Sequence, residues 1–365
     1  MGRIPTLPGI TERQVDTSRI STHVLTSGPD DATPVLFVHG NASSATFWEE
    51  TMLRLPLEYR GIAPDLRGYG ETEDKVVDAT RGMRDWVDDL LALADTMELD
   101  FFHLVGHSLG GSVAFALIAH ASERRILSAT LVAPGSPYGF SGSKGLDGTP
   151  SYSDFAGTGG GIVNAEFTQR MAAQDRSNDG LTAPRFVMNS FYWKPPFRAT
   201  REEELLSSML SERVGPRAYP GDFTSSPNWP NVAPGIFGPA NALSPKYVGD
   251  TVERFIALPR DRKPNIRWIR GADDQIVSDA SLFDLGTLGK IGAIPGWPGD
   301  DVFPPQPMVS QMRAVLRRYD PEGALSREVV FEDCGHTPYI EKPKAFDREF
   351  HAQLKVAVPL RVAKA

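Results

Sequence analysis

A turn built on the pattern G-x-S-x-G constrains this chain more than any other feature of its sequence. The pattern covers residues 106–110 (GHSLG) and stands between an apolar run at 101–105 (FFHLV) and an apolar stretch at 109–120. A sharp strand-to-helix turn crowds the residues two before and two after its centre, and Gly106 and Gly110 are the small residues it needs. Ser108 is then held at positive φ with its hydroxyl exposed at the carboxyl edge of a sheet. The alternative interpretation is a glycine-rich turn whose serine caps the helix.

The rest of the chain repeats this alternation of buried strands and helices. Short apolar runs suit strands that are buried on both faces. These runs are 34–38 (PVLFV), 61–64 (GIAP), 101–105 (FFHLV), 129–132 (ATLV), 265–269 (NIRWI) and 328–331 (EVVF). Helix patterns cover 83–97, 109–120, 308–319 and 344 to about 356. Such alternation predicts an α/β fold with a parallel sheet that helices flank.

The middle of the chain has a different texture. Residues 134–259 hold 29 glycines and prolines among 126 residues, well above average use. Short helix patterns remain at 165–174, 185–192, 201–210 and 245–258, and no buried-strand run appears there. We therefore expect an inserted cap or lid domain at 134–263. The core is expected at 1–133 and 264–365, with a second Gly/Pro-rich insertion at about 286–307.

A serine nucleophile needs a base, and the seven histidines of the chain narrow to His336. In chains with this turn the order is serine, acid, histidine. Four histidines precede the serine, His120 lies on the helix just after it, and His351 lies in the last helix pattern. His336 stands in a loop (334–338, CGHTP) directly after a predicted strand, where active-site residues of open α/β sheets gather.

The base in turn needs a carboxylate that orients it. The strand run 265–269 leads into the segment 271–277 (GADDQIV), which offers Asp273 and Asp274. One of the two is expected to face His336, and the spacing alone does not choose between them.

An oxyanion forms during acyl transfer, and two backbone N–H groups usually hold it. We expect one donor from Leu109, directly after the nucleophile. The other is expected from the loop 39–42 (HGNA) after the run 34–38, and the N–H of Asn41 is the preferred donor. Gly40 permits a tight backbone path in that loop, and His39 is expected to brace the loop rather than transfer protons.

Four motifs, in this order, resemble the α/β-hydrolase fold family. They are the H-G at 39–40, the D-x-R-G-x-G turn at 65–70, the elbow G-H-S-L-G-G at 106–111 and the closing G-H at 335–336. The resemblance covers about residues 12–133 and 264–357. It implies an eight-stranded, mostly parallel sheet with a large cap inserted after the sixth strand.

The resemblance also implies roles for particular residues. The family's acid pattern G-x-x-D-x-x-V aligns with Gly271, Asp274 and Val277, which favours Asp274 as the acid. Arg67 and Asp65 are implied to form a structural brace under the active site. The closing segment 335–343 (GHTPYIEKP) is similar to that of esterases, C–C bond hydrolases and cofactor-free haloperoxidases.

A serine at this position predicts an acyl-enzyme, and hence a metal-free hydrolase of carboxylic esters or lactones. Aromatic residues in the inserted segment, densest at Phe191, Tyr192 and Trp193, suggest an apolar pocket for an aryl or alkyl substrate, which His107 would also line. The alternatives on the same triad are a C–C bond hydrolase and a perhydrolase or haloperoxidase-like enzyme. A ligand-binding relative without catalysis is the non-enzyme alternative.

Composition limits the partners. The net charge is −8, from 38 basic and 46 acidic side chains without a basic run, which argues against nucleic acid. The sequence offers no apolar stretch of 18 residues for a membrane span and no metal-binding motif, so we expect a small-molecule substrate and no cofactor. A single cysteine, Cys334, fits a cytoplasmic location. The oligomeric state stays open, a homodimer included.

Overall fold

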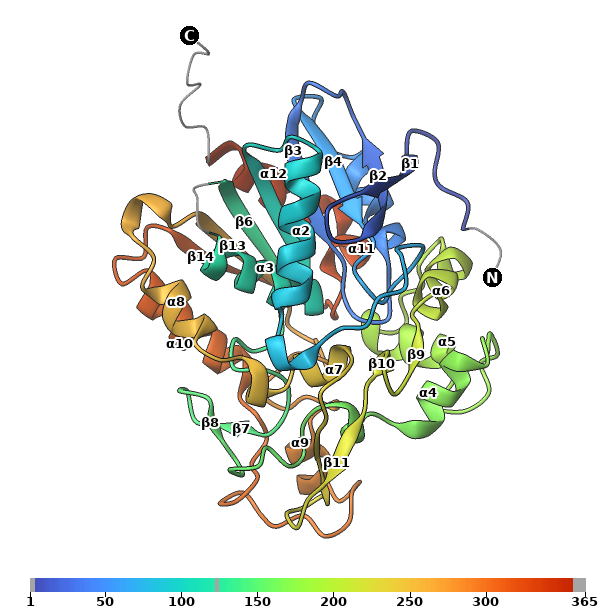
Figure 1. Cartoon of the computed structure of the whole chain (residues 1–365), viewed down its shortest axis with the longest axis vertical. Helices are drawn as coiled ribbons and strands as arrows, with labels where there is room; N and C mark the ends of the chain where they lie inside the picture. The colour runs from blue at the N-terminus through green and yellow to red at the C-terminus, as the bar shows by residue number, and fades with distance from the viewer. Residues whose placement is uncertain (1–3, 122–124, 357–365) are drawn as a thin grey trace.

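The computed structural model describes residues 4–121 and 125–356, and an eight-stranded sheet forms its centre (Figure 1). The strand order is β1-β2-β4-β3-β5-β6-β13-β14. The first strands pair antiparallel, β1 with β2 and β2 with β4, and the remaining neighbours pair parallel. The strands are β1 (Thr11–Asp16), β2 (Ser21–Ser27), β3 (Thr33–Val38), β4 (Tyr59–Pro64), β5 (Phe102–His107), β6 (Ile126–Val132), β13 (Asn265–Gly271) and β14 (Ser326–Phe331).

Helices cover both faces of this sheet (Figure 1). In β3, Leu36 and Val38 pack into the apolar cluster on one face, whereas Val35 and Phe37 pack into the cluster on the other. Successive side chains of a strand point to opposite faces, so a strand buried on both sides must be apolar throughout. The flanking helices are α1 (Glu49–Leu53), α2 (Arg84–Thr96), α3 (Leu109–His120), α10 (Met308–Tyr319), α11 (Pro338–Glu341) and α12 (Pro343–Val356), with the 3₁₀ turns η1 (Ala45–Trp48) and η2 (Ala79–Arg81).

Residues 134–263, called the inserted segment below, follow β6 and add no strand to the central sheet. The segment holds short elements. They are β7 (Ser143–Lys144), β8 (Thr149–Pro150), η3 (Gly160–Ile162), α4 (Ala165–Ala172), α5 (Pro184–Val187), the π-helical turn η4 (Met188–Tyr192), α6 (Glu202–Leu210), β9 (Val214–Gly215), β10 (Tyr219–Pro220), β11 (Phe223–Ser225), β12 (Val232–Pro234), α7 (Pro239–Ala242), η5 (Pro245–Tyr247), α8 (Thr251–Ile256) and η6 (Arg260–Arg262).

Two helix predictions in this segment need correction. The pattern at 245–258 divides into η5 and α8, with Gly249 at φ +59 between them. The pattern at 185–192 divides into α5 and the wider turn η4. The six short strands β7–β12 were not predicted, because two or three residues are too few for a periodic pattern.

The second insertion packs against the inserted segment at the lower end of the view in Figure 1. Its helix α9 (Leu285–Lys290) is capped at its N-terminus by Asp284, whose carboxylate accepts a hydrogen bond of 2.9 Å from the Ser141 hydroxyl. The Gln306 amide donates to the Gly139 carbonyl over 3.0 Å. The division of the chain into core and cap stays a prediction, and the residues 1–3, 122–124 and 357–365 of the predicted core lie outside the described residues. Within the described ranges, no helix has the length and apolarity that a bilayer crossing needs.

Candidate active site

Ser108 stands at the turn between β5 and α3 with φ of 53° and ψ of −120°. A Cβ added to Gly106 would overlap the Gly110 carbonyl oxygen, and one added to Gly110 would overlap the carbonyl oxygens of Val38 and His39. The two glycines are therefore required by the close backbone approach that forms the turn. The Ser108 side chain occupies the N-cap position of α3 but makes no capping hydrogen bond. This geometry disfavours the interpretation of Ser108 as a helix cap.

Gly110→Ala is expected to destabilise the protein by about 3 kcal/mol, because the added carbon must push the strand and the turn apart. Gly135→Ala is the matched control, since its added carbon would meet only the Ser112 hydroxyl, at 3.0 Å. Urea unfolding followed by circular dichroism measures both variants. Equal stability of the two variants would contradict the packing argument.

His336 is oriented by a buried carboxylate. Its Nδ1 lies 2.8 Å from Asp274 Oδ2, so Nδ1–H donates to the carboxylate and Nε2 is left as the basic nitrogen. The other oxygen of Asp274 accepts the N–H groups of Ile276 and Val277 over 2.8 and 3.0 Å. His336 and Asp274 are both buried. Ser108 Oγ and His336 Nε2 form no hydrogen bond in this structure, and such contacts often tighten only when substrate binds.

The structure places Asp274, and not Asp273, against His336. Asp273 points outward with 39% of its side chain exposed, and its carboxylate pairs with the Lys194 ammonium over 3.0 Å. The choice of Asp274 that the resemblance implied therefore agrees with the geometry.

The two backbone N–H groups of the predicted oxyanion hole lack an internal acceptor. Within the described ranges, neither the N–H of Asn41 nor that of Leu109 donates a hydrogen bond. Gly40 packs so closely on the elbow that an added Cβ would lie 3.1 Å from the Ser108 Cβ and 3.0 Å from His107 Nδ1. Two free N–H groups beside the nucleophile are the arrangement that an oxyanion hole needs.

His39 braces the loop that carries Asn41. Its Nε2 accepts the N–H of Leu66 over 2.9 Å, so Nδ1 carries the proton and donates to the Gly40 carbonyl over 2.8 Å. Burial lowers the pKa of His39, although the Asp65 carboxylate opposes that shift. With both ring nitrogens engaged, His39 is not available as a base.

His107 links the elbow to the loop of His336. Its Nε2 donates to the His336 carbonyl oxygen over 3.0 Å, which leaves Nδ1 to accept the Tyr339 hydroxyl over 3.3 Å. The rings of His107 and His336 lie 4.7 Å apart between centroids. Burial, and secondarily the neighbouring His336, lower the pKa of His107 well below its usual range. We conclude that His107 positions the loop as a neutral residue, and no contact marks it as a pocket wall.

The three aromatic residues predicted to line a pocket have different surroundings. Trp193 is 1% exposed, and its backbone packs on Gly335 next to His336. The Tyr192 hydroxyl donates to the Ala42 carbonyl over 2.9 Å. Phe191 is partly exposed and meets Phe283 edge-on at 5.1 Å. Trp193 and Tyr192 are thus packing residues between the inserted segment and the core, and Phe191 alone keeps an exposed ring surface.

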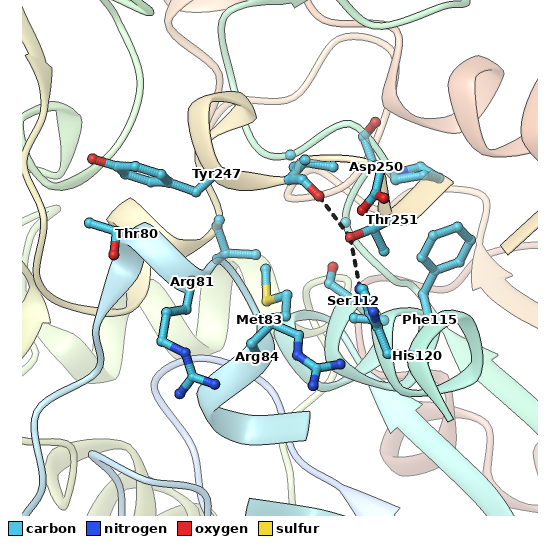
Figure 2. A pocket seen from close by; sticks show the side chains of 18 residues that line it. Thr80, Arg81, Met83, Arg84, Ser112, Phe115, His120, Tyr247, Asp250 and Thr251 are labelled. Carbon is cyan, nitrogen blue, oxygen red and sulfur yellow. Dashed lines mark hydrogen bonds between the residues drawn. The ribbon is translucent and has the colours of Figure 1, made fainter. Parts of the chain in front are cut away.

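A cavity of about 230 Å³ lies along α3, beginning one turn after Ser108 (Figure 2). Ser112, Phe115 and His120 form its wall on α3, and Thr251 faces them from α8. Ser108, Asp274 and His336 do not line this cavity. It is therefore separate from the candidate catalytic residues. No group of three or more His, Cys, Asp and Glu side chains within the described ranges could hold a metal ion.

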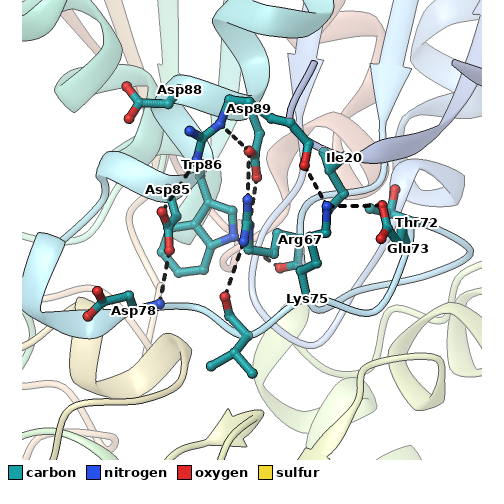
Figure 3. Close-up of polar contacts among 12 residues, drawn as sticks. Ile20, Arg67, Thr72, Glu73, Lys75, Asp78, Asp85, Trp86, Asp88 and Asp89 are labelled. Atoms are coloured by element: carbon teal, nitrogen blue, oxygen red, sulfur yellow. Dashed lines mark hydrogen bonds and ion pairs between the residues drawn. The ribbon is translucent and has the colours of Figure 1, made fainter. Parts of the chain in front are cut away.

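The resemblance implied a brace of Arg67 with Asp65, but Arg67 pairs with Asp89 instead (Figure 3). Arg67 donates to both oxygens of Asp89, over 2.7 and 2.8 Å, and to the Val76 carbonyl over 3.2 Å. Asp65 instead accepts His23 over 2.8 Å and the N–H of Ala45, in the loop that follows Asn41, over 2.8 Å. Both residues hold the loops under the site and contact none of the candidate catalytic side chains.

Sequence reasoning missed Glu212, a buried carboxyl in the turn after α6 that faces the N–H of Ala42. No motif or periodic pattern marks it, because its partners are distant in sequence.

A sequence profile described as the Alpha/beta hydrolase family matches residues 35–349. The chain is 33% identical over 115 residues to a 2-hydroxymuconate semialdehyde hydrolase of Pseudomonas sp. (strain CF600), which covers 31% of this chain and 40% of that protein. It is 32% identical over 114 residues to the uncharacterized carboxylesterase nap of Bacillus subtilis (strain 168), covering 31% of this chain and 37% of that protein. The chain thus matches less than half the length of these curated relatives.

Solved structures share the fold over nearly the whole chain. An esterase, RhEst1 from Rhodococcus sp. ECU1013, has a TM-score of 0.58 at 19% identity, covering 96% of this chain and 100% of that chain. The 2-hydroxy-6-oxo-6-phenylhexa-2,4-dienoate hydrolase of Rhodococcus sp. strain RHA1 has a TM-score of 0.55 at 17% identity, covering 95% and 99%. The profile match over most of the chain, the sheet order and the serine elbow together lead to one conclusion: the chain belongs to the alpha/beta hydrolase family.

Proposed function

We propose that this chain is a serine hydrolase that cleaves a carboxylic ester or lactone of an apolar or aromatic substrate through an acyl-enzyme. The observation that carries the proposal is the buried His336–Asp274 pair, whose loop is bonded to His107, the residue directly before a strained Ser108 whose side chain makes no cap. In this proposal Ser108 is the nucleophile, His336 the base and Asp274 the group that orients the base. Asn41 and Leu109 supply the oxyanion hole.

The proposed reaction has two halves. Ser108 Oγ attacks the substrate carbonyl while His336 Nε2 takes its proton, and the N–H groups of Asn41 and Leu109 stabilise the oxyanion. The leaving alkoxide takes the proton from His336 as the carbon–oxygen bond breaks. His336 then removes a proton from water, which attacks the acyl-enzyme and releases the acid and free Ser108.

C–C bond hydrolysis of a vinylogous diketone acid is the alternative on the same residues, and it calls for an arginine that binds the substrate carboxylate. Three arginines of the inserted segment each have another role. Arg185 pairs with Glu202 and Glu203, Arg198 donates to the carbonyls of Asn189 and Phe197, and Arg217 lies 4.2 Å over the Phe237 ring. These contacts favour ester cleavage over the C–C reaction.

Hydrolysis of a p-nitrophenyl ester series, from acetate to decanoate, tests the proposal. We expect a burst of p-nitrophenol equal to the enzyme concentration and an acyl group on the peptide that carries Ser108, read by mass spectrometry. Hydrolysis of a vinylogous diketone acid and formation of a peracid are measured in parallel. Turnover of the diketone acid without turnover of any ester would favour the alternative. The absence of all turnover and of fluorophosphonate labelling at Ser108 would favour a ligand-binding protein.

We further propose that the inserted segment acts as a cap and that Phe191 borders the acyl pocket. Phe191→Ala is expected to shift the preferred acyl chain by about two carbons towards longer esters, because the removed ring frees volume that CH₂ groups can fill at about 0.8 kcal/mol each. The chain-length profile of kcat/KM checks this. Phe197→Ala is the matched control, because the Phe197 ring packs edge-on against buried Trp193, at 5.8 Å between centroids. An unchanged profile for Phe191→Ala would remove Phe191 from the pocket.

A further inference from the structure

Glu212 is an acid in an unusual place. It lies in the turn between α6 and β9 and is 3% exposed. Both of its carboxyl oxygens are buried and lack a partner in good hydrogen-bond geometry. Native proteins rarely bury a carboxyl in this way, because an unpaired polar group loses its hydration without compensation. A buried acid that survives in such a site therefore calls for an explanation.

Its neighbours all belong to the support of the candidate oxyanion hole. The Ala42 N–H and the Tyr69 hydroxyl lie close to the carboxyl, but neither is in good hydrogen-bond geometry with it. The Tyr69 hydroxyl itself donates to Asn41 Oδ1 over 2.8 Å. Ala42 has φ of +46°, a backbone conformation that an alanine adopts only when its surroundings hold it there. Glu212 thus contacts the strained residue directly after Asn41.

The other ionisable groups around Glu212 are tyrosines. Tyr69 follows β4, Tyr192 ends η4 and Tyr219 begins β10, and all three face this carboxyl. The neighbouring Arg213 donates instead to the carbonyls of Gly70 and Thr72. Burial raises the pKa of Glu212 well above its usual range, and the contacts with Tyr69 and Ala42 offset this only in part. Glu212 therefore keeps its proton to a higher pH than an exposed glutamate does.

We propose that Glu212 is a positioning residue for the oxyanion hole, which fixes the Asn41–Ala42 turn from the inserted segment. The proposal rests on the proposed function, since it assigns Asn41 N–H as an oxyanion donor. In this proposal the Glu212 carboxyl lies against this turn at Ala42, and the Tyr192 hydroxyl holds the turn by donating to the Ala42 carbonyl over 2.9 Å. The inserted segment would thereby set the position of a donor that belongs to the core.

The neutral form is the functional one in this proposal. An ionised Glu212 would place a buried negative charge beside the donor that must stabilise another negative charge, the oxyanion. Activity should therefore fall as the pH rises through the raised pKa of Glu212. The same group affects stability: its neutral form is favoured in the folded protein, so its contribution is complete below the ordinary value of 4.5 and is lost as the pH rises towards the raised pKa.

Three variants in the full chain test the role of Glu212, with p-nitrophenyl butyrate as the substrate. Glu212→Leu removes the polar carboxyl and is expected to lower kcat about 10²-fold with little change in KM. A loss of this size is expected when the Asn41 N–H is displaced by about 1 Å. Glu212→Gln keeps an uncharged polar group of the same shape and is expected to stay within about 3-fold of the wild-type kcat. Glu203→Leu is the matched control, because Glu203 lies on α6 with 61% of its side chain exposed.

The pH dependence separates positioning from simple packing. We expect the wild-type kcat to fall as the pH rises through the raised pKa of Glu212 and the Glu212→Gln kcat to stay level. The free energy of unfolding of Glu212→Gln relative to wild type should rise with pH from about 4.5 upwards. This second measurement keeps the proposal testable if Glu212→Leu does not fold.

The outcomes distinguish this proposal from the proposed function. If the wild type is active and Glu212→Leu keeps the wild-type kcat, the positioning role alone is overturned. The same holds if kcat of wild type and of Glu212→Gln depends on pH in the same way. If the wild type hydrolyses no ester but its Ser108 reacts with a fluorophosphonate, the labelling rate replaces kcat in the same comparison. If Ser108 neither turns over nor reacts, the proposed function fails and the positioning role fails with it.

Discussion

Ser108→Ala is expected to reduce kcat for p-nitrophenyl butyrate by about 10⁴- to 10⁶-fold, the range seen when the nucleophile of a serine hydrolase is removed. The alanine cannot form the acyl-enzyme, and the remaining catalysis would come from the oxyanion hole and substrate binding alone. The reaction is followed by p-nitrophenol release, with the fold of the variant checked by circular dichroism. The burst of p-nitrophenol should disappear together with the steady-state rate.

Ser112→Ala is the matched control for this variant. Ser112 lies one turn further along α3, lines the separate cavity of Figure 2, and its hydroxyl is buried without a partner. We expect its kcat to stay within about 2-fold of wild type, since a surface or cavity hydroxyl without a partner contributes little. A Ser108→Ala protein that keeps a tenth or more of its activity would rule out Ser108 as the nucleophile.

Asp274→Asn is expected to lower kcat by about 10⁴-fold, because the amide turns the histidine into the wrong tautomer while the geometry is kept. An Asn side chain can still accept the N–H groups of Ile276 and Val277 through its oxygen. Its NH₂ group then faces His336 Nδ1, which must become the acceptor, so the proton moves to Nε2 and the base is lost. Single-turnover acylation rates measure this step directly.

Asp273→Asn separates the two neighbouring carboxylates. This change weakens only the exposed pair with Lys194, and such surface pairs contribute about 0–1 kcal/mol. We expect kcat within about 3-fold of wild type and a small loss of stability. If Asp273→Asn proved the more damaging of the two, the assignment of the acid would be wrong.

The buried framework of the fold could be predicted from the sequence because its signals are local. The helix predicted at 109–120 matches α3, and the six apolar runs all lie in strands of the central sheet. The strands β3, β4, β5, β6 and β13 are buried at most positions, so their apolar runs stand out against their flanks. The run at 328–331 is the exception, because β14 lies at the edge of the sheet and is mostly exposed. The opposite edge strand, β1, is also mostly exposed and has no such run, and in β2 buried and partly exposed positions are interspersed.

The composition marks the inserted segment as an insertion, but the sequence does not predict its individual strands and helix boundaries. Its strands have two or three residues, and its helices break at glycines or widen into a π turn. What stabilises these pieces is contact with the core, such as the bond of 2.7 Å from Thr337 Oγ1 to the Tyr192 carbonyl. Contacts of this kind leave no periodic pattern in the residues around them.

The sequence by itself determined the serine elbow, the histidine and the family-like order of the motifs. The steric need for Gly106 acts within five residues, because an added Cβ would overlap the Gly110 carbonyl oxygen, whereas the need for Gly110 comes from the carbonyl oxygens of Val38 and His39. The spacing left Asp273 and Asp274 open and the resemblance favoured Asp274, but only the tertiary structure shows its contact with a histidine 62 positions away, and it alone brings Glu212 close to Ala42. These choices depend on which side chain a distant loop presents, and the spacing of residues along the chain does not carry that information.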